Sequence, residues 1–117
     1  MSNKKKFSIV IPIFNEQENI KLLYQEIVNS IDKNIYEYEV NFVDDKSTDG
    51  SFDILDKLRK ENNNVNLIEN KKNYGQSFAL KNGILNSRYS AILTIDGDGQ
   101  NNPKDIEKIT NIFFSSD

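Results

Sequence analysis

Phe7-Ser-Ile-Val-Ile-Pro-Ile-Phe-Asn-Glu16 is the segment from which the architecture can be inferred first. Its first seven residues are mainly β-branched, which predicts a β-strand over 7–13. Apolar residues then recur at helical spacing over 20–31, which predicts a helix. Asn15, followed three residues later by Glu18, is typical of a capping box. The segment therefore predicts a strand followed by a helix that Asn15 caps.

The same alternation of strand and helix continues along the chain. The further predicted strands and helices are 38–44, 52–60, 65–69, 76–85 and 91–95, with a last helix beginning at Asn102-Pro103. Strands that alternate with helices need long, right-handed crossovers, which give a mainly parallel sheet with helices on both faces. The sequence therefore predicts the α/β class, with three layers (α/β/α), in a single domain over 1–117.

Composition excludes several classes of function. The chain has 15 Lys and Arg against 18 Asp and Glu, so it lacks the excess of cations on which general affinity for nucleic acid depends. It has no Cys and no His, which excludes disulfides, the usual zinc sites, thiol nucleophiles and imidazole bases. The apolar stretch 7–14 is too short to cross a bilayer. Carboxylates, amides, lysines and backbone groups are left to perform any chemistry.

Asp96-Gly-Asp98 directly follows the predicted fourth strand. Two carboxylates separated by one residue can reach one hard cation together, and Gln100 adds an amide oxygen. Mg²⁺ and Mn²⁺ prefer oxygen ligands and keep positions for water and phosphate oxygens, so such a site suits a diphosphate. Gly97 and Gly99 leave room for the approach of a ligand. A simple acidic turn is the alternative, because Asp and Gly are favoured in turns.

Further polar clusters follow the other predicted strands, at the edge where parallel α/β sheets bind ligands. Pro12, Phe14 and Glu16 are candidates for the wall of a nucleobase site, in which Phe14 supplies an apolar face and Glu16 a polar group. In Asp44-Asp45, one carboxylate could accept a hydrogen bond from a base N–H or a ribose hydroxyl. Lys72, with Lys71, could face a phosphate.

These clusters also have purely structural explanations. Asp45 could cap the second helix together with Ser47, Thr48 and Asp49, because their side-chain oxygens can accept backbone N–H groups. Lys71 and Lys72 could be ordinary solvated charges.

Four stretches, taken in order, resemble the motifs of glycosyltransferase family 2, the GT-A enzymes, and within it the dolichyl- or polyprenyl-phosphate sugar transferases. They are Phe7 to Glu16, Val43-Asp-Asp-Lys-Ser-Thr-Asp-Gly-Ser51, Asn73-Tyr-Gly75 with Ala79 and Gly83, and Asp96-Gly-Asp-Gly-Gln-Asn-Asn-Pro103. Lys46 stands where Gly is common in the family, and Lys72 where many members carry Arg.

The resemblance implies an inverting transfer of a sugar from a UDP- or GDP-linked donor. Asp96 and Asp98 would be the catalytic pair, and Asp96, Asp98 and Gln100 would hold Mg²⁺ or Mn²⁺, which stabilises charge on the departing nucleoside diphosphate. An acceptor that is a polyprenyl phosphate is already an anion and needs no strong general base. Family members usually continue for ~100 residues or more, which supply the acceptor contacts. We therefore expect a truncated, cytoplasmic domain that binds donor but turns over poorly, reaches a membrane only through a missing part, and is compatible with a homo-oligomer.

Two other interpretations stay open from the residues. Thr94-Ile-Asp-Gly-Asp-Gly99 resembles the nucleophile motif of haloacid-dehalogenase-like phosphatases, although that motif normally lies on the first strand and has Thr or Ser where this chain has Gln100. A non-catalytic nucleotide-binding module is the second.

Overall fold

The computed structural model describes residues 4–97. Within them the chain forms β1 (Lys5–Ile13), α1 (Ile20–Ser30), β2 (Tyr36–Asp44), α2 (Ser51–Glu61), β3 (Val65–Glu69), α3 (Gln76–Leu85) and β4 (Ile92–Thr94). The helix expected after Asn102-Pro103, and with it Asp98 and Gln100, lies outside the described residues.

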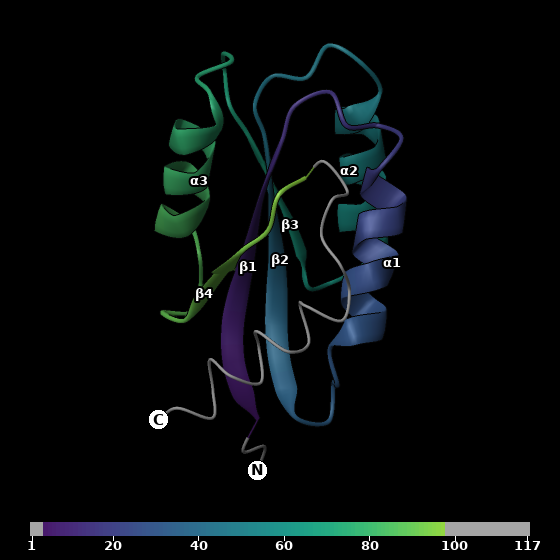
Figure 1. Ribbon diagram of the computed structural model, residues 1–117, viewed down its shortest axis with the longest axis vertical. Helices are drawn as coiled ribbons and strands as arrows, with labels where there is room; N and C mark the ends of the chain where they lie inside the picture. Colours follow the sequence, from purple (N-terminus) through teal and green to yellow (C-terminus); the bar gives the residue numbers. More distant parts are fainter. Residues whose placement is uncertain (1–3, 98–117) are drawn as a thin grey trace.

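The four strands form one parallel sheet in the order β3-β2-β1-β4. From β1 to β2 to β3 the chain moves in one direction across the sheet, and from β3 it returns past both to β4. Because such crossovers are right-handed, this reversal puts α3 on the face opposite α1 and α2, as Figure 1 shows. The predicted three-layer α/β class with a parallel sheet is confirmed.

The larger part of the core lies between the sheet and the α1–α2 layer. Side chains alternate between the two faces along a strand, so Phe7, Ile9, Ile11 and Ile13 of β1 all enter this layer and are buried. Val10 points to the other face, where it packs in a small cluster with Val43 and Ala79 under α3. Both faces of the central strands are thus covered, which is why the sequence of β1 is almost continuously apolar.

The start of α1 differs from the prediction. The helix begins at Ile20, its N-cap is Asn19, and no side chain caps it. Asn15 has a positive φ of 54°, and its Oδ1 accepts hydrogen bonds from the backbone N–H groups of Thr48 (2.8 Å) and Asp49 (3.3 Å). The predicted capping box is therefore wrong: neighbouring parallel strands end at the same edge, and Asn15 ties the loop after β1 to the loop after β2.

No helix within residues 4–97 has the length and hydrophobicity that crossing a bilayer requires.

Candidate functional site

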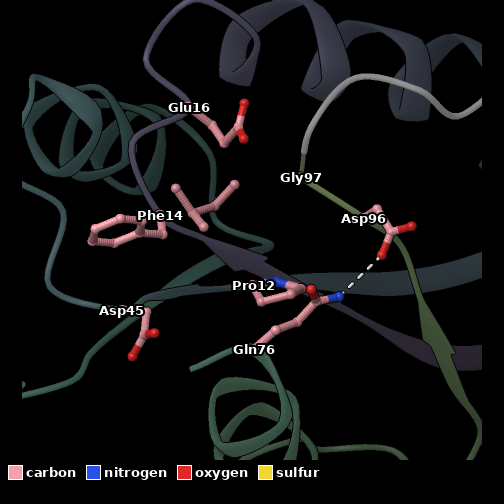
Figure 2. Close-up of a pocket in the computed structure, with 8 residues that line it drawn as sticks. Pro12, Phe14, Glu16, Asp45, Gln76, Asp96 and Gly97 are labelled. Carbon is pink, nitrogen blue, oxygen red and sulfur yellow. Dashed lines mark hydrogen bonds between the residues drawn. The ribbon is translucent and has the colours of Figure 1, made fainter. Parts of the chain in front are cut away.

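A pocket of about 330 Å³ opens at the carboxyl edge of the sheet. The loops after β1, β2 and β4 and the first residue of α3 surround it. Its lining residues are Pro12, Ile13, Phe14, Glu16, Asp45, Gln76, Asp96 and Gly97. Figure 2 shows the side chains of Gln76 and Asp96 directed toward each other. Five of the predicted site residues are therefore brought together: Pro12, Phe14, Glu16, Asp45 and Asp96.

Hydrogen bonds to residues that follow β2 hold the loop on the β1 side of the pocket. The backbone N–H of Asn15 donates to Ser47 Oγ at 3.0 Å, and the backbone N–H of Glu16 donates to Ser51 Oγ at 2.9 Å. The Glu16 carboxylate accepts from Asn19 Nδ2 at 2.8 Å. Phe14 is 42% exposed at the rim, which leaves its ring accessible to a ligand. The turn after β2 and the first residue of α2 therefore fix the loop after β1 that carries Phe14 and Glu16.

Asp44 and Asp45 have different surroundings, because successive side chains at a strand end point to opposite sides. Asp45 lines the pocket. Its Oδ1 accepts from Asn70 Nδ2 and from the Tyr74 N–H, both at 3.0 Å, and its Oδ2 accepts from the Gly75 N–H at 2.8 Å.

Tyr74 and Gly75 immediately precede α3, so the Asp45 carboxylate stabilises the amino end of that helix through hydrogen bonds and the helix dipole. The purely structural explanation, in which Asp45 caps the second helix, is wrong. At that helix it is Asp49 that accepts from the Ser51 N–H, at 2.9 Å. The parallel register places the end of β2 beside the loop that follows β3, where Asp45 meets the donors of α3.

Asp44 is 2% exposed and is not among the residues that line the pocket. Its Oδ1 accepts from Ser47 Oγ at 2.5 Å, and Ser47 in turn accepts from the Asn15 N–H. Burial raises the pKa of the Asp44 carboxyl above its ordinary value, and the hydrogen bonds from Ser47 oppose this shift only in part. In the structure Asp44 supports the loops of the pocket and does not face into it.

Asp44→Asn should change how stability depends on pH. A raised folded-state pKa means that folded Asp44 binds more protons than the unfolded chain between its ordinary value of 3.8 and the raised value. Wild type therefore loses stability from this group as the pH rises through that window, and the asparagine variant does not. In thermal melts from pH 4 to pH 7, we expect the melting temperature of the variant to rise relative to that of wild type as the pH increases. A difference between the two proteins that is constant across this range would contradict it.

Gln76 is a pocket residue that the sequence analysis did not identify. It is the first residue of α3, and its Nε2 donates to Asp96 Oδ1 at 3.3 Å, the contact drawn in Figure 2. The available signal was its place directly after Asn73-Tyr-Gly75, at the same sheet edge as the acidic residues. Lys72 lies in this loop, exposed, and does not line the pocket.

Gly97 is buried against the end of β1. A Cβ at this position would lie 2.6 Å from the Pro12 carbonyl oxygen and 2.7 Å from Ile13 Cδ1. The chain after β4 approaches the end of β1 so closely that only glycine fits. Packing within the protein thus requires glycine here, which differs from the expectation that Gly97 leaves room for a ligand.

Among residues 4–97 no group of three or more acidic side chains is arranged to hold a metal ion. Of the three predicted ligands only Asp96 is described. It is exposed at the edge of the pocket and offers carboxylate oxygens, which suits a hard cation that takes its other ligands from water and phosphate.

The comparisons with known proteins agree with this geometry. The model of a family described as "Glycosyl transferase family 2" matches residues 8–115. The undecaprenyl-phosphate 4-deoxy-4-formamido-L-arabinose transferase of Pseudomonas fluorescens is 37% identical over 103 residues, 87% of this chain and 30% of that protein. The transferase of the same name from Photorhabdus laumondii is 37% identical over 106 residues, 90% of this chain and 33% of that protein. The chain thus spans about a third of the length of these relatives.

Solved structures show the same fold. S. aureus TarS, residues 1–349, superposes with a TM-score of 0.71 and 27% identity, over 96% of this chain and 33% of that one. Its complex with UDP-GlcNAc gives a TM-score of 0.70, also at 27% identity, over 96% of this chain and 32% of that one. The mannosyltransferase PcManGT from Pyrobaculum calidifontis, at 20% identity, has a TM-score of 0.70 over 83% of this chain and 28% of that one. Because the family model matches nearly the whole sequence, this chain belongs to glycosyltransferase family 2.

Proposed function

We propose that the pocket binds the nucleotide-diphosphate sugar donor of a glycosyltransferase whose acceptor is a polyprenyl phosphate. The single observation that carries the proposal is the convergence of Glu16, Asp45, Gln76 and Asp96 on one pocket at the carboxyl edge of a parallel sheet, where such sheets bind nucleotides. Relatives named for undecaprenyl phosphate and a neighbour solved with UDP-GlcNAc support the choice of acceptor and donor.

The nucleoside would lie against Pro12 and Phe14, and the Asp45 carboxylate would accept a hydrogen bond from it. A carboxylate offers about four lone-pair sites, and Asp45 uses three on Asn70, Tyr74 and Gly75. One site remains for a ribose hydroxyl or a base N–H. Asp44 does not face the pocket, so in this proposal its role is to hold Ser47 and the loop of Asn15.

The diphosphate would lie beside Asp96, with Asp98 and Gln100 completing the set of oxygen donors for Mg²⁺ or Mn²⁺. When bound, that cation would stabilise the negative charge of the departing nucleoside diphosphate. Gln76 orients the Asp96 carboxylate through its hydrogen bond, and Lys72, in the loop that Asp45 anchors, would approach the phosphates from the rim. A phosphate acceptor attacks directly, which gives inversion at the sugar carbon in a single displacement.

Asp96→Ala should remove the metal-dependent part of nucleotide binding. For wild type we expect UDP or GDP with Mn²⁺ to raise the melting temperature, since a ligand at ~100 times its dissociation constant adds about 2.7 kcal/mol. In Asp96→Ala the shift with Mn²⁺ should fall to the shift measured in EDTA. Differential scanning fluorimetry with and without each nucleotide measures both.

Asp32→Ala is the matched control, because Asp32 is exposed in the α1–β2 connection and also accepts one hydrogen bond, from the Asn34 N–H. It should keep the full metal-dependent shift. Loss of that shift in both variants, or a wild-type shift that is equal in Mn²⁺ and EDTA, would overturn the assignment of Asp96.

A further inference from the structure

The outward side of α3 carries apolar side chains that no other described element covers. Phe78, Lys81 and Leu85 of α3 follow one another at spacings of three and four residues, which places them on one side of the helix. Tyr74, which precedes the helix, joins this row through its ring contact with Phe78. Tyr74 is 48% exposed, Phe78 45% and Leu85 74%, and the Tyr74 and Phe78 rings pack with centroids 4.4 Å apart. Ile84, beside this row, is 44% exposed. These five residues are called the α3 outer face below.

The opposite side of α3 is packed on the sheet, with Ala79 and Gly83 buried. The helix is therefore apolar on both sides, which is typical of a helix with partners on both sides. Within residues 4–97 α3 is the one helix on its face of the sheet, as Figure 1 shows. The α3 outer face has the composition of a contact surface.

The segment of the chain that carries this surface contains charges of a single sign. Residues 70–95 contain no Asp or Glu, although the whole chain has 18, and they carry four cations: Lys71, Lys72, Lys81 and Arg88. The ion pairs found among the described residues join Lys6, Lys57, Arg59 and Lys60 to acidic partners, all outside this segment. A chain with a net charge of −3 thus carries only cations within this segment, and the carboxylates that contact it, which include those of Asp45, Asp96 and Glu39, come from other parts of the chain.

We propose that the α3 outer face docks on an anionic lipid surface. Aromatic and aliphatic side chains beside lysines are the composition of helices that lie in the membrane interface. Lysine stems lie along apolar surface while the ammonium groups reach lipid phosphates. A second copy of the same face is disfavoured, because two cationic surfaces repel each other. Gln76, the first residue of α3, lines the pocket, so docking would bring that pocket close to the lipid. The docking does not depend on the proposed transfer reaction.

Vesicle sedimentation tests the proposal with the chain of 117 residues. We expect binding to phosphatidylglycerol vesicles, weakening in high salt because exposed charges are screened, and little binding to phosphatidylcholine. Lys81→Glu with Leu85→Ser should lower the partition coefficient on phosphatidylglycerol by roughly tenfold or more, since each lysine near an anionic surface contributes about a fivefold factor and reversal also adds repulsion. Lys71→Glu with Phe78→Ser, at the other end of the face, is an independent second variant with the same expected loss.

Lys21→Glu with Leu22→Ser is the matched control. Both residues are exposed on α1, on the other face of the sheet, with Leu22 61% exposed, and the changes in charge and apolar area are alike. The control should bind vesicles as wild type does. Equal loss in the control, equal binding to both lipids, or no binding to phosphatidylglycerol would overturn the proposal. A lipid-free dimer that the Lys81→Glu, Leu85→Ser variant abolishes would overturn it too, since the face would then be a self-interface.

Discussion

Asp45→Ala is expected to lower the free energy of unfolding by about 3 kcal/mol and to abolish stabilisation by nucleotide. The substitution leaves three donors without their acceptor: Asn70 Nδ2 and the backbone N–H groups of Tyr74 and Gly75. Asp45 and Asn70 are each 3% exposed, and a buried donor left unsatisfied costs about 1–3 kcal/mol. Urea denaturation measures the loss, and hydrogen exchange at the Tyr74 and Gly75 amides locates it.

Two neighbouring changes make this prediction specific. Asp45→Asn can keep the Oδ1 contacts but presents an NH₂ group to the Gly75 N–H, so it should cost about 1–2 kcal/mol. Asp44→Ala removes a buried carboxylate from the adjacent residue, whose partner is Ser47, and should leave exchange at Gly75 unchanged. An Asp45→Ala protein with wild-type amide protection at Tyr74 and Gly75 would show that the carboxylate does not hold the start of α3.

Gly83→Ala is expected to destabilise the protein by about 2 kcal/mol, although alanine is the better helix former by about 1 kcal/mol. Gly83 lies in α3 where the helix meets the sheet. A Cβ there would overlap Val10 Cγ1 and lie 2.9 Å from Val43 Cγ2. Neither valine can move easily, because both are fully buried, so the helix itself must shift outward. Thermal and urea denaturation measure the effect.

A double-mutant cycle distinguishes this overlap from a general effect on the helix. Val10→Ala alone should destabilise by leaving a cavity, but in the Gly83→Ala background it also removes the atom that the new Cβ meets. We expect the double variant to be more stable than the sum of the single changes, with a coupling of about 1 kcal/mol or more. Strict additivity, or a Gly83→Ala protein as stable as wild type, would contradict the close packing of α3 on β1 and β2.

The class of fold, the order of elements and the edge that carries the pocket were all predictable. The predicted helix 76–85 and strand 65–69 agree with α3 and β3 residue for residue, and β1 and β2 begin only two residues earlier than expected. These features depend on the spacing of apolar residues along the chain and on the right-handedness of crossovers, which is the same in nearly all proteins. Pro12, Phe14, Glu16, Asp45 and Asp96 line one pocket because the ends of parallel strands share one edge of the sheet.

What each polar side chain does at that edge was decided only in three dimensions. Asn15 was expected to cap its own helix, but its side chain accepts hydrogen bonds from Thr48 and Asp49. Capping of α2 was the alternative role considered for Asp45, but its carboxylate binds the backbone N–H groups at the start of α3. The sequence alone determined which residues reach the edge, because periodicity is a property of neighbours in the chain. Only the tertiary structure determined their hydrogen-bond partners, because a short polar side chain bonds to whichever donor lies within about 3 Å, and here that donor belongs to a segment some 30 residues away.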